Sequence, residues 1–159
     1  MDARYLDALK ALAEPHRLTL FWLLIHVDQK ITVAEAMDVT GETQYNVSRN
    51  LKMLFKAGLL TQEKRGKWVY YTLASQEQNH WISLVDSARH LPKESFKDLT
   101  IRCHRRLTMR VEGECVIGPS SQEWADFVIG VQLKNVDKQI SYDIQKHCEQ
   151  SNQGKLIRH

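Results

Sequence analysis

The chain lacks a hydrophobic run long enough to cross a membrane, because the apolar run Phe21–Ile25 is far shorter than the roughly 20 residues that a spanning helix needs. Residues 1–17 carry acids and a helical pattern where a signal peptide would have an apolar core, so we expect no signal peptide. Cysteine is scarce and odd in number, with 3 in 159 residues, which argues against a disulfide framework. Together these absences predict a cytoplasmic protein.

Signatures of common enzyme classes are missing as well. The sequence contains no glycine-rich phosphate loop, no His-Glu-x-x-His zinc motif and no Gly-x-Ser-x-Gly nucleophile turn. Cys103 and His104 are adjacent, and adjacent residues of a helix point about 100° apart, so they would make a poor nucleophile–base pair. We therefore expect that the protein is not an enzyme.

Positive charge is concentrated in one segment of the chain. The whole chain has a formal net charge of only +3, whereas residues 42–72 contain six cations and two anions, a local charge of +4. The cations are Arg49, Lys52, Lys56, Lys64, Arg65 and Lys67. A local basic surface is typical of nucleic-acid-binding proteins, although charge alone would also fit an ordinary solvated face.

Periodicity and capping residues predict the order of the elements. Residues 3–14 have apolar residues at helical spacing, and residues 16–27 are apolar nearly all round, as in a buried helix. Residues 32–41 and 43–58 each begin with a threonine that can cap a helix and end near a glycine that can stop it. Residues 59–73 read as two strands joined by a tight turn. The pattern predicts a mainly α fold with a small two-stranded β-wing, a winged helix-turn-helix domain.

The helix predicted within residues 43–58 has two contrasting faces. Val47, Leu51 and Leu54 fall on one side together with Phe55, and we expect them to dock on the buried helix. The opposite side is polar and cationic, as expected for a second helix that lies in the DNA major groove. The residues predicted to bind DNA are Thr43, Gln44, Tyr45, Ser48, Arg49 and Lys52 on this helix and Lys64, Arg65 and Lys67 on the wing.

Three motifs in this order resemble the bacterial ArsR/SmtB family of winged-helix repressors. They are Leu12-Ala13-Glu14-Pro15-His16-Arg17-Leu18, Val47-Ser48-Arg49-Asn50-Leu51 and Gly66-Lys67-Trp68-Val69-Tyr70-Tyr71-Thr72-Leu73. Asn50 stands where the family usually has a histidine, which would alter a DNA contact and not the fold. The resemblance implies a homodimeric repressor that binds a double-stranded DNA operator and is released by a metal, a metalloid, an oxidant or a small molecule.

The resemblance also implies a helix after the wing that packs against its mate and against the first helix. Residues 76–91 contain an apolar stripe that suits this role, although the stripe could instead pack back on its own domain. The residues expected in the dimer interface are Leu6, Leu9, Trp81, Leu84, Val85 and Ala88. We accordingly expect a DNA-binding domain at 1–75, a helical dimerisation and effector region at 76–150, and a flexible tail at 151–159.

The metal sites known in this family are absent or altered here. Residues 32–36 contain no cysteine where the family's metalloid site has a pair. His80 and His90 would lie about 15 Å apart on one helix, too far to share one zinc ion within a chain, which leaves only a zinc site split across a dimer.

The three cysteines, Cys103, Cys115 and Cys148, all lie beyond the wing. Cys103 and Cys148 fall on the apolar stripes of helices predicted at 93–110 and 122–150, where a buried small hydrophobe is the commoner case. Cys115 lies in a glycine-bounded loop and is expected to be accessible, and the cations after Cys103 would lower its pKa if it were exposed. A thiol site for arsenite, zinc or an oxidant therefore stays open, as does the rival hypothesis of a winged-helix protein-interaction module without specific DNA binding.

Overall fold

The computed structural model describes residues 2–156, except for the side chains of residue 144 and of residues 147–156. The chain divides into two compact units, Met1–Pro119 and Ser120–His159. No helix in the described part of the chain is both long and apolar enough to span a membrane.

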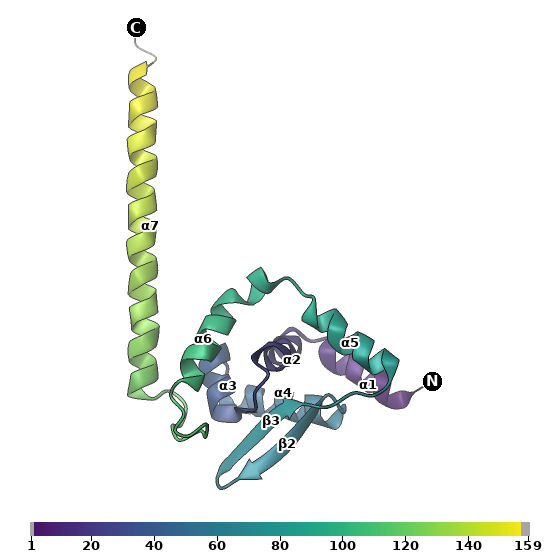
Figure 1. The fold of residues 1–159 in the computed structure, drawn as a ribbon. Helices are drawn as coiled ribbons and strands as arrows, with labels where there is room; N and C mark the ends of the chain where they lie inside the picture. The colour runs from purple at the N-terminus through teal and green to yellow at the C-terminus, as the bar shows by residue number, and fades with distance from the viewer. Residues whose placement is uncertain (1, 157–159) are drawn as a thin grey trace. The chain divides into compact units, whose positions relative to one another are not determined.

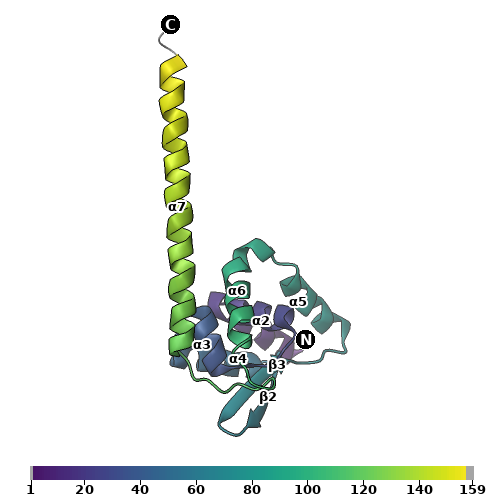
Figure 2. The same cartoon turned by 60° about the vertical axis from the view of Figure 1, so that its left-hand side comes forward.

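The first unit contains the predicted winged helix-turn-helix fold, which is confirmed (Figure 1). The helices α3 and α4 form the helix-turn-helix, and the strands β2 and β3 form the wing, which projects from the helices in both views (Figures 1 and 2). The elements of this unit are α1 (Ala3–Leu12), α2 (Pro15–Val27), β1 (Ile31–Thr32), α3 (Val33–Thr40), α4 (Gln44–Lys56), β2 (Leu60–Arg65), β3 (Trp68–Leu73), α5 (Asn79–Arg89), the 3-10 helix η1 (Lys93–Phe96) and α6 (Lys97–Leu107).

Local capping chemistry fixes the ends of α3 and α4, the two helices of the helix-turn-helix, as predicted. The Thr32 hydroxyl accepts from the backbone N–H of Glu35, and the Glu35 carboxylate accepts from the backbone N–H of Thr32, so α3 begins with a capping box. Thr43 caps α4 by accepting from the backbone N–H of Asn46. Gly41 ends α3 in the left-handed region at φ 74°, a conformation that glycine adopts without strain.

Helix α2 forms the centre of the core, because its residues are apolar on nearly every side. Residues 20–25 are all buried, and α1, α4, α5 and α6 pack against this helix. Val47, Leu51 and Leu54 are almost fully buried on α4, as predicted. Phe55, which was expected on the same side of the helix, is 37% exposed.

The wing belongs to a three-stranded sheet with the order β1-β3-β2, and the two-residue strand β1 was not predicted. Both pairings are antiparallel, with Ile31 opposite Tyr71 and Arg65 opposite Trp68. A strand of two residues has no alternation for a sequence pattern to reveal, since its identity depends on the partner strand about forty residues away. β1 ties the segment before α3 to the base of the wing.

Helix α5 packs back on its own unit, which corrects part of the predicted dimer interface. Trp81, Val85 and Ala88 are each only 6% exposed and belong to the core of the same chain. The reason is that α2 is apolar on the side that faces α5, so the stripe already has a partner within the protomer. Leu84 is half-buried against the same core, whereas Leu6 and Leu9 on α1 remain 39% and 41% exposed.

The structural boundary lies at Pro119–Ser120 and not after the wing, because α5, η1 and α6 share the core of the first unit. The second unit consists of one helix, α7 (Gln122–Leu156). Residues 151–156, predicted as part of a flexible tail, form the last residues of this helix. The assignment of DNA-binding and dimerisation roles to 1–75 and 76–150 stays a prediction.

Candidate DNA-binding surface

The outer face of α4 carries the side chains that the sequence predicted for DNA binding. Gln44, Tyr45, Arg49 and Lys52 are exposed and Ser48 is half-buried, while Thr43 caps the helix at its start. These side chains line an open depression of about 770 Å³. The lining residues are Gln44, Tyr45, Ser48, Arg49, Lys52, Met53 and Lys56.

The cations of this face have no acidic partners in the described part of the chain, where no ion pair involves Arg49, Lys52 or Lys56. Tyr45 is 71% exposed, so its phenol is accessible from solvent. The helix thus presents a base-reading amide, a guanidinium, a phenol and two lysines on one side, all of them available to a polyanion.

Asn50 stands where the family named in the sequence analysis usually has a histidine. Its side chain does not lie on this face. Its side chain is 9% exposed and lines a smaller pocket of about 190 Å³ between α2, α4 and α6, together with His16 and Glu42. The expectation that this substitution alters a DNA contact therefore finds no direct support in its position.

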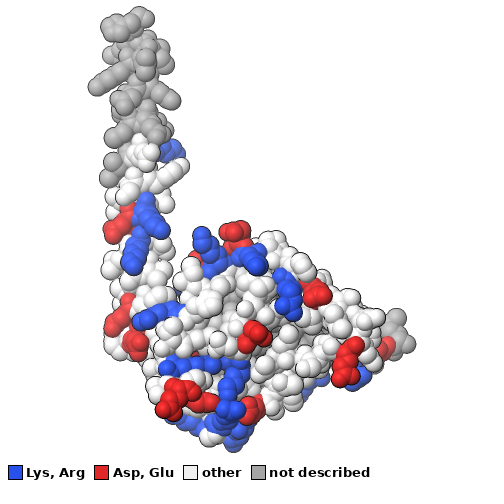
Figure 3. All heavy atoms as spheres, in the orientation of Figure 1, with Lys and Arg blue, Asp and Glu red and all other residues white. Residues whose placement is uncertain are grey.

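The wing carries the remaining predicted residues at its turn. Gly66 has φ 57°, as a tight hairpin turn requires, and Lys64, Arg65 and Lys67 are exposed around it. The ammonium of Lys67 lies over the ring of Trp68, 4.8 Å from its centroid. Arg65 differs from its neighbours, because its guanidinium contacts Glu63 at 2.8 Å and Glu114 at 2.6 Å. Figure 3 shows basic and acidic side chains side by side around the end of the wing, at the bottom of the view.

Known proteins match this part of the chain. Residues 12–63 match a family described as a helix-turn-helix domain. The arsenical resistance operon repressor of Bacillus subtilis is 35% identical over 80 residues, which cover 50% of this chain and 75% of that protein. The chain belongs to the ArsR/SmtB family.

A second relative is named as an activator of transcription, whereas the first is named as a repressor. The transcriptional activator HlyU of Vibrio cholerae is 31% identical over 84 residues, which cover 53% of this chain and 76% of that protein. A solved structure of HlyU from Vibrio cholerae aligns with a TM-score of 0.47 and 27% identity, covering 55% of this chain and 92% of that one.

The two described cysteines of this ArsR/SmtB-family protein are buried and give no support to the predicted thiol site. Cys115 is 2% exposed, so the expectation that its loop leaves it accessible is wrong. Its Sγ lies 3.6 Å from the Thr32 hydroxyl, against the start of α3. Cys103 is fully buried, and its own burial together with the nearby charge of Glu35 raises the pKa of its thiol to about 12.

Metal binding at these thiols gains no support from their surroundings. No group of three or more potential ligands among histidine, cysteine, aspartate and glutamate occurs in the described part of the chain. Among the cations that follow Cys103, Arg110 lowers the pKa of its thiol, but burial in the core outweighs this effect. The third predicted thiol, Cys148, lies outside the residues whose side chains are described.

Two buried ion pairs attach α6 and the loop after it to α3, the first helix of the helix-turn-helix. Arg106 donates from Nε to Asp38 at 2.7 Å, with side chains 1% and 3% exposed. Arg110 donates two hydrogen bonds of 2.7 and 2.8 Å to the Glu35 carboxylate, and these side chains are 6% and 1% exposed. Burial opposes the charge of Arg110, but the hydrogen bonds and charge of Glu35 raise its pKa above the ordinary value.

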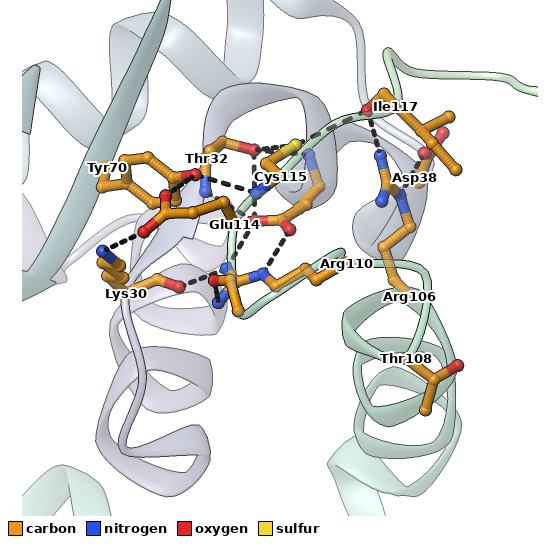
Figure 4. A network of polar contacts seen from close by, with 12 residues as sticks. Lys30, Thr32, Asp38, Tyr70, Arg106, Thr108, Arg110, Glu114, Cys115 and Ile117 are labelled. Carbon is orange, nitrogen blue, oxygen red and sulfur yellow. Dashed lines mark hydrogen bonds and ion pairs between the residues drawn. The ribbon is translucent and has the colours of Figure 1, made fainter. Parts of the chain in front are cut away.

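The loop after α6 also reaches the wing, and Figure 4 shows Glu114 of this loop beside Tyr70 of β3 and beside Lys30. One oxygen of Glu114 contacts Arg65 and Lys30, at 2.6 and 3.3 Å, and the other accepts a hydrogen bond of 2.7 Å from the Tyr70 hydroxyl. The same hydroxyl accepts a hydrogen bond of 2.8 Å from the backbone N–H of Cys115. α3 and the wing are therefore connected through a segment that follows them by about forty residues or more.

Sequence reasoning missed this network, although one local signal was present. The spacing of Thr32 and Glu35 is that of a capping box, which marks Glu35 as an acid with a structural role. No comparable signal marks Asp38, Arg106 or Glu114, because their side-chain partners lie 44 to 84 residues away in the sequence.

Proposed function

We propose that the protein is a DNA-binding transcriptional regulator that places α4 in the major groove and the wing on the neighbouring backbone. The observation that carries the proposal is the outer face of α4, where exposed Gln44 and Arg49 lie among cations without acidic partners. Gln and Arg are the side chains best suited to bidentate contacts with adenine and guanine edges, and lysines and tyrosine suit phosphates. Its relatives support the regulatory role, since they are named as a repressor and an activator of transcription.

We further propose that it acts as a homodimer and as a repressor on an operator of double-stranded DNA. Leu6 and Leu9 remain exposed on one side of α1, and a second copy would cover them. Two copies would double the number of phosphate contacts and read two half-sites. Release by an effector is part of this proposal, and the buried Cys103 and Cys115 give no support to a site at those thiols.

The test is fluorescence anisotropy on labelled duplex DNA from the region upstream of the protein's own gene, with unrelated duplex as competitor. Arg49→Ala is expected to weaken binding by about 1–3 kcal/mol and to reduce the preference over unrelated DNA, with an unchanged circular dichroism spectrum. Lys97→Ala is the matched control, because Lys97 is exposed on α6, away from α4 and the wing.

A protein-interaction module without specific DNA binding would give a different result. It would bind both duplexes equally weakly, and Arg49→Ala and Lys97→Ala would have the same small effect. That outcome would reject the assignment of α4 to the major groove.

A further inference from the structure

We propose that Glu114 is an internal competitor for DNA phosphate: its carboxylate occupies an anion-binding site, formed by Arg65, Lys30 and Tyr70, that a backbone phosphate takes when the wing meets DNA. The inference rests on the proposed DNA-binding function and adds to it a residue that sets the strength of binding. It assigns a role to the segment after α6, which lies beyond the helix-turn-helix family match at residues 12–63.

The geometry around Glu114 is that of an anion site. A guanidinium, an ammonium and a hydroxyl converge on one carboxylate, with Arg65 and Lys30 on one oxygen and Tyr70 on the other. Phosphate oxygens accept hydrogen bonds from these same groups in protein–DNA complexes. Lys30 is oriented further by the ring of Tyr70, whose centroid lies 4.6 Å from its ammonium nitrogen.

Contacts on both sides of the turn fix the position of the Glu114 carboxylate. Val111 and Glu114 exchange backbone hydrogen bonds of 3.1 and 2.9 Å across a tight turn, and Gly113 adopts φ 76° within it. On one side of the turn Arg110 is fixed to Glu35, and on the other the backbone of Cys115 is fixed to Tyr70. A carboxylate anchored on both sides competes for the cations at little further cost in conformational entropy.

The site is open enough for the exchange. The side chains of Arg65 and Glu114 are 48% and 40% exposed, so a phosphate can approach the guanidinium from solvent without unfolding the loop. Tyr70 is 1% exposed and faces the site from the interior. The hydrogen bond from Tyr70 and the charges of Lys30 and Arg65 outweigh desolvation and lower the pKa of Glu114, which keeps it anionic at neutral pH. Arg65 also forms an ion pair with Glu63, so a second acid competes with DNA phosphate for this guanidinium.

The consequence for DNA binding has a definite sign. Each cation that neutralises a phosphate steepens the dependence of log K on log salt by about 0.9, and at physiological salt this corresponds to roughly fivefold in affinity. While Glu114 pairs with Arg65 and Lys30, these two cations do not contribute fully to the affinity for DNA. Removing its charge should therefore tighten binding, whereas the loss of a merely structural contact would loosen the wing and weaken binding.

The experiment is a salt titration of DNA binding by the full-length Glu114→Gln variant, on the specific duplex and on an unrelated one. We expect binding to tighten by about 5- to 30-fold and the salt dependence to steepen by about 1 to 2 units, for one or two released cations. Glu112→Gln is the matched control, because this exposed acid lies in the same turn and its removal changes the net charge equally. It should show a much smaller effect.

Two further variants make the test specific to the site. In an Arg65→Ala background the gain from Glu114→Gln should shrink, because one of the two released cations is gone. Glu114→Asp keeps the charge but draws it back by one methylene, so it should raise DNA affinity in the same direction but by less. This variant replaces Glu114→Gln in the test if Glu114→Gln lowers the melting temperature.

Failure of this inference can be told from failure of the proposed function. If wild-type protein prefers its specific duplex and Arg49→Ala weakens binding, but Glu114→Gln leaves affinity and salt dependence unchanged or lowers both, Glu114 only anchors the loop. If wild-type protein shows no preference for any duplex, the DNA-binding function itself is rejected and this inference with it.

Discussion

The guanidinium of Arg110 binds the carboxylate of Glu35 in a two-pronged contact that is almost completely buried. The same carboxylate accepts from the backbone and the hydroxyl of Thr32, so it caps α3 and receives Arg110 at once. A residue beyond α6 thereby fixes the start of the helix-turn-helix.

Removing Arg110 should be costly for stability. Arg110→Met leaves the Glu35 carboxylate buried without its cation, and we expect the free energy of unfolding to fall by about 3–5 kcal/mol. Urea denaturation followed by circular dichroism measures the change. Arg89→Met, which breaks an exposed pair with Asp86, should cost no more than about 1 kcal/mol. Equal losses in the two variants would contradict the importance of the buried pair.

The thiols should be inert in the folded protein. Burial raises the pKa values of Cys103 and Cys115, so little thiolate exists near neutral pH. In a Cys148→Ser background we expect Ellman's reagent to modify neither thiol until denaturant is added, and we expect arsenite to leave DNA affinity unchanged. Rapid labelling of one thiol in the folded protein, or release of DNA by arsenite that Cys115→Ser prevents, would restore the thiol-sensor hypothesis.

The pH dependence of stability should show the contribution of Glu114. Because its folded-state pKa lies below the ordinary value of 4.5, its stabilising contacts are fully present above that pH. They are lost as the pH falls through the lower folded-state pKa. The difference in melting temperature between wild type and Glu114→Gln should therefore be constant above pH 4.5 and shrink below it, as thermal unfolding by circular dichroism can measure. A difference that persisted unchanged in strong acid would contradict this prediction.

Two exposed apolar faces compete for the role of dimer interface. One is formed by Leu6 and Leu9 on α1, and the other lies along α7 and consists of Ile129, Leu133, Val136 and Ile140. We expect the double substitution Leu6→Glu and Leu9→Glu to yield monomers in sedimentation velocity and to weaken DNA binding. The control is Leu133→Glu with Ile140→Glu; monomers from this pair alone would place the interface in the second unit.

Local signals in the sequence predicted most of the first unit. Threonine caps, glycine stops and the two-faced pattern of α4 depend on residues three or four positions apart, and all of these were confirmed. The exposed positions of Gln44, Arg49 and Lys52 followed from the same periodicity.

What could not be predicted depends on residues far apart in the chain. Cys115 looked accessible because glycines flank its loop, yet Tyr70 and Arg106 hold that loop against α3 and the sheet. Trp81 is buried because α5 covers a side of α2 that α1, α4 and α6 leave uncovered. The arrangement of these helices, and with it the free side of α2, cannot be read from local sequence. Periodicity reveals that a helix has an apolar face, but it does not reveal which neighbour covers that face.

The buried pairs of α3 also decide where this protein can be cut. A fragment ending after the wing, near residue 75, would contain Glu35 and Asp38 but neither of the arginines that neutralise them. The face of α3 that α6 covers in the full chain would then be open to solvent, and its two acids would lack the cations that neutralise them. An excised DNA-binding module suitable for fusion to another protein would need to extend through Gly118, where the last carbonyl contact of Arg106 lies.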